Sequence, residues 1–150
     1  MGNITMNAKD AISAKLAECF VTINNRRFLL MQGKDFEAKF EKTKKEINIL
    51  GKTGAGNKST GWKGTGKLTI YKNTSLFDEL MEQYKNTGED IYLDIQVTND
   101  DPTSAAGICT MVFMQCNIDG GVLAAFDVEG DFLEQEINFT FEDFSNPTKF

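Results

Sequence analysis

The alternation of apolar and polar side chains along most of the chain limits the fold more than any other feature. Phe36, Ala38 and Phe40 are separated by charged residues, which gives a period of two. Successive side chains of a β-strand point to opposite faces, so this period is typical of half-buried strands. Similar segments recur at 19–31, 67–72, 91–98, 108–118, 122–128 and 132–144. The pattern predicts about seven or eight strands.

One segment departs from this pattern and predicts an α-helix over about residues 75–87. Leu76, Leu80 and Tyr84 recur at helical spacing. Ser75 is expected to be the N-cap, and Gly88 is expected to end the helix. Residues 1–150 therefore predict one mainly β domain, a β-sandwich or small barrel with one flanking helix.

A glycine-rich segment, 51–66, separates two of the expected strands. It holds six Gly, three Lys and the only Trp of the chain. Such a composition predicts a long loop, and long loops inside small domains are usually functional or disordered. The segment lacks the phosphate-binding pattern because Asn57 interrupts the required Gly-Lys-Ser order and a strand follows. Its side chains predict contacts with a partner, with Lys52, Lys58 and Lys63 supplying charge and Trp62 an aromatic anchor.

The first 15 residues are polar with scattered apolar positions and predict an extended arm. These residues contain no charged segment followed by an apolar stretch, so we expect no signal peptide. No apolar run approaches the roughly 18 residues needed to cross a bilayer, so we expect no membrane anchor.

Charge is separated along the chain. Residues 1–85 carry 15 Lys and Arg against 9 Asp and Glu, whereas residues 86–148 carry 13 Asp and Glu and no Lys or Arg. A domain with one basic and one acidic segment offers complementary surfaces to other copies of itself. Head-to-tail contacts of this kind produce rings or filaments.

Histidine is absent, which removes the usual general base and the commonest metal ligand. The three cysteines, Cys19, Cys109 and Cys116, lack metal-site spacing. We therefore expect no enzymatic activity, no metal and no cofactor. A monomeric β-barrel module that binds single-stranded nucleic acid or a small ligand stays open as an alternative, since Trp62 and Tyr71 lie among basic residues.

Several stretches resemble the tail tube proteins of contractile-tailed phages. The similarity is strongest to the group known from defective PBSX-like prophages and phage-tail-like bacteriocins. It rests on collinear segments: Ala11–Lys15, KKEINILGK (Lys44–Lys52), KSTGWKGTG (Lys58–Gly66), YKNTS (Tyr71–Ser75) and FTFEDFSNP (Phe139–Pro147).

This resemblance implies six-subunit rings that stack into a hollow tube inside a sheath. The channel would serve DNA passage, without specific binding, or membrane puncture. Sheath, baseplate and tail terminator proteins would be partners, the virion tail the location, and the host cytoplasm the place of assembly. The loop and the N-terminal arm would reach neighbouring subunits, so the predicted contact residues are Ile12, Lys15, Lys52, Lys58, Trp62 and Lys63. The resemblance itself assigns no role to Trp62.

A channel that passes DNA would benefit from an acidic lining that repels phosphate. Some of the acids between residues 86 and 148 are therefore expected to face the lumen. Asp94, Glu134 and Glu136 are the candidates, because each lies on the polar side of a predicted strand.

Overall fold

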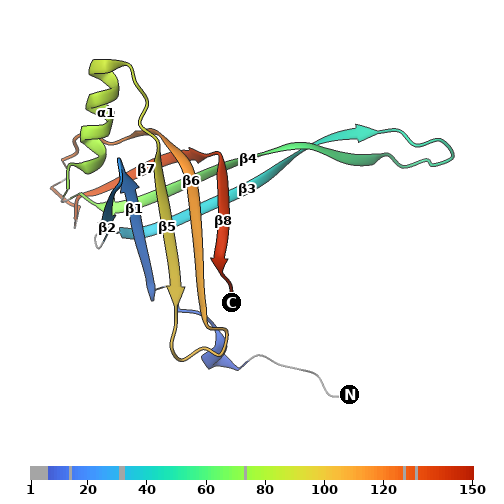
Figure 1. Ribbon diagram of the computed structural model, residues 1–150, viewed down its shortest axis with the longest axis horizontal. Helices are drawn as coiled ribbons and strands as arrows, with labels where there is room; N and C mark the ends of the chain where they lie inside the picture. Colours follow the sequence, from blue (N-terminus) through green and yellow to red (C-terminus); the bar gives the residue numbers. More distant parts are fainter. Residues whose placement is uncertain (1–6, 14, 31–32, 73, 127, 131) are drawn as a thin grey trace.

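Strands dominate the fold, as Figure 1 shows for the computed structural model. The structure describes residues 7–13, 15–30, 33–72, 74–126, 128–130 and 132–150. Its elements are a short 3₁₀-helix (Ala8–Asp10), β1 (Ala17–Ile23), β2 (Arg26–Leu29), β3 (Gly33–Ile47), β4 (Gly56–Tyr71), α1 (Leu76–Thr87), β5 (Leu93–Asp100), β6 (Ile108–Gly121), β7 (Glu134–Phe141) and β8 (Asp143–Thr148). Part of the predicted arm, residues 1–6 and 14, lies outside the described residues.

The strands form one antiparallel sheet in the order β2-β1-β5-β6-β7-β4-β3, with β8 pairing β6. β6 pairs with β5 and β8 along its first part and with β7 near its end, so it belongs to both halves of the sheet. The half formed by β7, β4 and β3 crosses the half formed by β1, β5, β6 and β8 (Figure 1). The expected mainly β fold with one helix is confirmed, but the sheet does not close into a barrel.

The core lies between the two halves of the sheet. Its fully buried side chains come from both halves and from α1, including Val21, Ile95, Leu68, Phe139 and Phe77. Burying a side chain of this size contributes roughly 1.5–3 kcal/mol. The apolar positions of the alternating pattern are therefore the core face, as the sequence predicts.

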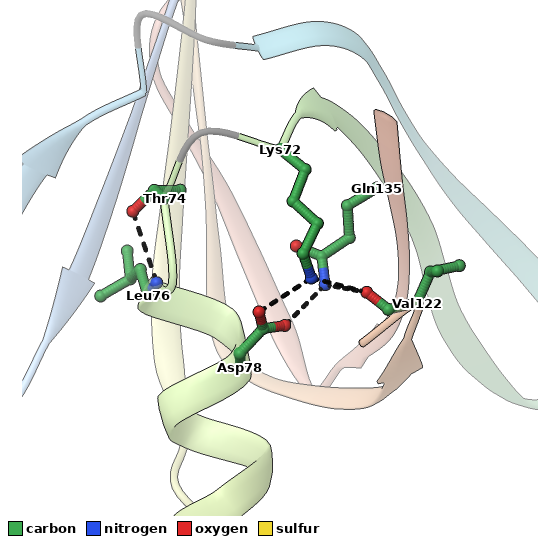
Figure 2. A network of polar contacts seen from close by, with 6 residues as sticks. All are labelled: Lys72, Thr74, Leu76, Asp78, Val122 and Gln135. Atoms are coloured by element: carbon green, nitrogen blue, oxygen red, sulfur yellow. Dashed lines mark hydrogen bonds and ion pairs between the residues drawn. The ribbon is translucent and has the colours of Figure 1, made fainter. Parts of the chain in front are cut away.

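The helix is confirmed at nearly the predicted bounds. Gly88 ends it in the left-handed conformation at φ 74°, and its N–H donates to the carbonyl of Tyr84 at 2.7 Å. Ser75 occupies the N-cap position, but its side chain makes no capping hydrogen bond. Instead the N–H of Leu76 donates to Oγ1 of Thr74 at 3.4 Å (Figure 2).

The prediction of a loop over 51–66 is wrong for most of its length. Residues 48–55 connect β3 to β4, and from Gly56 onward the segment is strand. Gly64 and Gly66 lie opposite Phe141 and Phe139 in the register of β4 and β7. A Cβ atom at these two glycines would lie 2.3 and 2.2 Å from the facing rings. These glycines therefore make room for aromatic side chains and do not loosen the backbone.

The prediction of a strand over 122–128 is also wrong. β6 continues through Gly121, which pairs with Ile137 of β7. The described residues 122–126 and 128 form no strand, and residue 127 lies outside the described set. Leu123 and Phe126, whose apolar side chains suggested a buried strand, are exposed.

Two local features follow from the residues themselves. Asn24 and Asn25, at φ 50° and 65°, form the turn between β1 and β2, where a hairpin needs left-handed residues. The register of β3 with β4 shifts between Thr43 and Lys44, where the alternation of apolar residues changes parity before Ile47.

The packing at Gly66 can be tested against Gly61 on the same strand. We expect Gly66→Ala to lower the free energy of unfolding by roughly 1–3 kcal/mol, because the new methyl group overpacks the ring of Phe139. Gly61→Ala meets no atom within 4 Å and should change stability by less than about 0.5 kcal/mol. Urea denaturation of both variants measures this, and equal stabilities would contradict the packing argument.

Candidate subunit interfaces

The hairpin of β3 and β4 extends far beyond the two crossing halves of the sheet (Figure 1). Residues 41–63 are exposed on both strands, with only Gly56 half-buried. The ladder between the strands nevertheless continues to the pair Ile47 and Gly56. The hairpin beyond Phe40, residues 41–63, is therefore a projecting element whose side chains contribute little to the core; we call it the hairpin arm.

Aromatic side chains fix the base of the hairpin arm. Trp62 stacks on Phe40 with ring centroids 5.0 Å apart, and its ring meets Phe144 edge-on at 5.9 Å. Phe141 lies 6.1 Å from the same ring. Trp62, which the sequence predicts as an anchor for a partner, therefore packs within its own subunit, although 39% of its surface stays exposed.

The tip of the hairpin arm is apolar. Ile47 and Ile49 are each more than two-fifths exposed, and Leu50 is fully exposed. Gly51 adopts φ 86°, and the N–H of Lys52 donates to the carbonyl of Ile49 at 3.2 Å, so the tip is a hydrogen-bonded turn. These three apolar side chains are not among the predicted contact residues, although Leu50 breaks the alternation directly before a glycine.

Lysines surround this apolar tip. Lys52 lies in the turn, and Lys58 lies directly opposite Lys45 in the strand register. Like charges placed opposite each other across a strand pair are unfavourable, so an acidic partner would relieve them. Lys63 differs, because its Nζ lies 3.6 Å from Oε2 of Glu41 on the neighbouring strand. Of the three predicted lysines, two are thus placed at the outer part of the hairpin arm and one near its base.

The described part of the N-terminal arm lies against the turn that follows β5. Asp101 accepts hydrogen bonds from the N–H of Ser13 at 3.0 Å and from Oγ1 of Thr103 at 2.7 Å. Asp10 adds to the attachment, since its carbonyl accepts from Ser104 Oγ at 2.9 Å. Hydrogen bonds from the Thr103 side chain, and then from the backbone N–H groups of Ser13 and Thr103, hold the pKa of Asp101 below its usual value.

The predicted contacts of this arm have different exposures. Ile12 is half-buried beside the attached turn, whereas Lys15 is exposed. Lys15 lines one side of an open groove of about 890 Å³ between β1 and β3, whose floor includes Phe36, Val97 and Phe113. The N-terminal arm is therefore attached to the rest of the subunit through Asp10 and Ser13. The residues before Asn7 lie outside the described set.

The three lumen candidates do not share one surface. Glu134 and Glu136 lie on the outward face of β7, where burial alternates strictly along the strand. Asp94 lies on the outward face of β5 in the crossing half of the sheet, and its Oδ1 accepts from the N–H of Gln115 at 3.3 Å. Because the core separates these two faces, a channel lined by one of them leaves the other outside.

The outward face of β3, β4 and β7 carries lysines and carboxylates in pairs. Lys34 Nζ lies 2.6 Å from Glu134 Oε1, and this hydrogen bond together with the charge of Glu134 raises the pKa of Lys34. Lys39 lies 3.1 Å from Glu37. Exposed pairs of this kind contribute little to stability, but they neutralise positive charge on a face that would otherwise attract phosphate.

A partly buried polar network joins α1, β7 and the end of β4 to the segment after β6 (Figure 2). Lys72 Nζ and Gln135 Nε2 both donate to the carboxylate of Asp78 and to the carbonyl of Val122, at 2.8–2.9 Å. Burial acts to raise the pKa of Asp78, but these hydrogen bonds and the charge of Lys72 outweigh it and lower the pKa. The network fixes the point at which the chain leaves β6.

Beyond this point the chain exposes apolar side chains. Leu123, Phe126, Val128 and Phe132 are each more than three-fifths exposed. The ring of Phe132 meets Tyr71, the last residue of β4, edge-on at 6.0 Å. This segment, residues 122–133, is a second apolar surface; we refer to its described residues as the β6–β7 loop.

Reactive chemistry is sparse in the part of the chain that the structure describes. No group of three His, Cys, Asp or Glu side chains there is arranged to hold a metal ion. Burial raises the pKa of the Cys19 thiol to about 11 and, as the largest cause, that of Cys116 to about 12, so both stay protonated near neutral pH. No helix among the described residues is long and apolar enough to cross a membrane.

Comparison with known proteins gives this architecture its context. Residues 4–147 match the family described as "Phage tail tube protein". The chain belongs to the phage tail tube protein family. It is 38% identical to the phage-like element PBSX protein XkdM of Bacillus subtilis (strain 168), over 97% of both chains. The expected kinship with PBSX-type prophage proteins is therefore confirmed.

Solved structures share the fold at much lower identity. One belongs to the sheath-tube complex of an extracellular contractile injection system, PVC, in the extended state, with 12% identity, 94% coverage of both chains and a TM-score of 0.66. Another belongs to the 6-fold symmetrised baseplate of the anti-feeding prophage, with 8% identity, 97% coverage of both chains and a TM-score of 0.64. Tail tube proteins are structural components of phage tails and related particles, so this chain belongs to a structural family and not to an enzyme family.

The attachment of the N-terminal arm can be tested at Asp101. Asp101→Asn should increase the amide exchange of residues 7–13 several-fold, because the hydrogen bonds to Ser13 and Thr103 lose their charged acceptor. Since the pKa of Asp101 is lowered in the folded protein, the attachment should weaken as pH falls through that pKa, and wild type and variant should then converge. The neighbouring Asp100→Asn is the control, and hydrogen exchange resolved by residue is the measurement. Equal exchange in both variants would contradict the account.

Proposed function

We propose that this tail tube protein forms six-subunit rings that stack into the inner tube of a contractile phage tail or a phage-tail-like particle. The observation that carries the proposal is the hairpin arm. It projects from the core with an apolar, lysine-flanked tip that its own subunit leaves exposed. Ordering a projecting hairpin costs conformational entropy. Burial of its apolar tip against another copy offsets that cost.

Ring formation follows from the open sheet. β2 and β3 lie at its two ends, and each pairs on one side only among the described strands. β3 has 15 residues, which makes it a long edge for backbone pairing. Such edges invite pairing with another chain, and a closed ring satisfies them. The six-fold symmetry described for the anti-feeding prophage baseplate supports six subunits for the ring.

The lumen would be the outward face of β3, β4 and β7. Its lysines are matched by carboxylates, as in the pairs Lys34–Glu134 and Lys39–Glu37, and Glu136 adds further negative charge. A face with neutralised lysines and surplus carboxylate holds phosphate weakly, so DNA slides along it without specific binding. The channel would serve DNA passage in a virion or membrane puncture in a particle without DNA.

The partners follow from this position in the particle. The tube would contact a sheath around it, a baseplate at one end and a terminator at the other. Two of the structural relatives come from assemblies that contain a sheath or a baseplate. The virion tail is then the location, with assembly in the host cytoplasm.

Shortening the hairpin arm tests the stacking. We expect replacement of residues 44–60 by Asn-Gly to leave the fold intact, because the pair Thr43 and Gly61 then flanks a two-residue turn and the removed side chains are outside the core. The free energy of unfolding should change by less than about 1 kcal/mol. Tubes should be lost, and sedimentation velocity should show rings or smaller species.

Gly61→Ala, which keeps the full hairpin arm, is the matched control and should still assemble. Long tubes from the shortened variant would overturn the assignment of the hairpin arm to stacking.

Neutralising the lumen face tests the channel. The double variant Glu134→Gln/Glu136→Gln releases Lys34 from its partner and adds two units of positive charge per subunit. DNA passage should become several-fold slower at low salt and recover at high salt, because phosphate contacts are screened. Asp94→Asn, on the opposite outward face, should leave the rate unchanged. Ejection kinetics of phages carrying each variant measure this, and a slowing by Asp94→Asn alone would place the lumen on the other face.

A further inference from the structure

Two exposed apolar surfaces lie at opposite ends of the molecule. The first is the tip of the hairpin arm, with Ile47, Ile49 and Leu50. The second is the β6–β7 loop, where Leu123, Phe126 and Phe132 are exposed. Figure 1 shows the hairpin arm reaching one end of the longest axis, while the chain between β6 and β7 lies at the other end, beside α1.

β4 connects the two surfaces and sets the distance between them. Its first residue, Gly56, pairs with Ile47 at the tip, and its last residue, Tyr71, contacts Phe132 of the loop. A strand of 16 residues spans roughly 50 Å at about 3.3 Å per residue. The tip therefore cannot reach the loop of its own subunit.

The charges around the two surfaces are opposite. The hairpin arm carries six Lys and two Glu, whereas the β6–β7 loop lies inside the stretch 86–148, which has no Lys or Arg. Complementary charge steers two surfaces together and suppresses contacts between like surfaces. It therefore disfavours tip against tip and loop against loop.

We propose that the tip of the hairpin arm docks on the β6–β7 loop of a second copy in the adjacent ring. Ile47, Ile49 and Leu50 then cover the exposed side chains of Leu123, Phe126 and Phe132. The contact is heterologous, because each copy offers one surface and receives the other. A head-to-tail contact of this kind can repeat from one copy to the next along an axis, as stacked rings require.

The polar network at the start of the loop supports its role as the receiving surface. Lys72 and Gln135 hold the carbonyl of Val122 through hydrogen bonds of 2.8 Å (Figure 2). Gln135 is fully buried, so its side chain is fixed by the core, while Val122 itself lies at the surface. A loop fixed at its first residue presents its apolar side chains in a defined place, which lowers the cost of docking.

Cysteine cross-linking tests this pairing. Thr53 beside the tip and Ala125 in the loop are exposed, so Thr53→Cys/Ala125→Cys should leave both the fold and the apolar contact residues unchanged. Treatment of assembled protein with a short bis-maleimide should give a ladder of covalent multimers, because each copy links to two neighbours. A mixture of the two single variants should stop at dimers, since each copy then has one reactive position.

The matched control is Thr53→Cys/Glu82→Cys, which moves the second thiol to the exposed face of α1. Wild type should give no ladder, because its three cysteines are buried or half-buried. The inference rests on the proposed ring stacking. Electron microscopy of each sample distinguishes failure of the docking contact from failure of ring stacking. Tubes without a ladder, dimers from Thr53→Cys alone, or an internal cross-link would each overturn the pairing while leaving the tube in place. Absence of tubes or rings from every sample would instead overturn the proposed function.

Discussion

The close contact between the phenylalanine rings of β7 and the glycines of β4 is the constraint on which the rest of the structure depends. Phe139 and Phe141 occupy the space that side chains at Gly66 and Gly64 would fill. This contact packs β4 against β7 within the core, while β4 also pairs β3. With its C-terminal half fixed in this way, β4 extends beyond the core at its N-terminal end, where it pairs with β3 to form the hairpin arm.

The projecting hairpin is energetically unfavourable in a single subunit, because its apolar side chains are exposed and two of its lysines repel each other. Its apolar tip is exposed, and Lys45 and Lys58 face each other across the ladder. The β6–β7 loop shows the same imbalance at the opposite end, with exposed Phe126 and Phe132 in the acidic part of the chain. Contact between copies resolves both imbalances together, and membership of the tail tube family gives that contact its biological setting.

The sequence predicted the strands and the helix well where periodicity governs, as in α1 with Gly88 at its end. It failed at 56–66 because glycine is depleted in strands, and a strand whose glycines accommodate rings from the next strand has no local signature. It failed at 122–128 for the opposite reason, since Leu123 and Phe126 read as core but are exposed. Apolar residues reserved for another copy look like core in a single sequence. Asp94 shares the alternating pattern with Glu134 and Glu136 but not their face, because the pattern within one strand does not show which half of the sheet that strand joins.

Cryo-electron microscopy of the wild-type protein at high concentration tests the central claim most directly, which is that opposite ends of one subunit recognise further copies. The account predicts hollow cylinders of stacked six-fold rings in which the tip of every hairpin arm is buried against the adjacent ring. Cylinders in which residues 44–60 extend freely into solvent would contradict it, as would single subunits at every concentration.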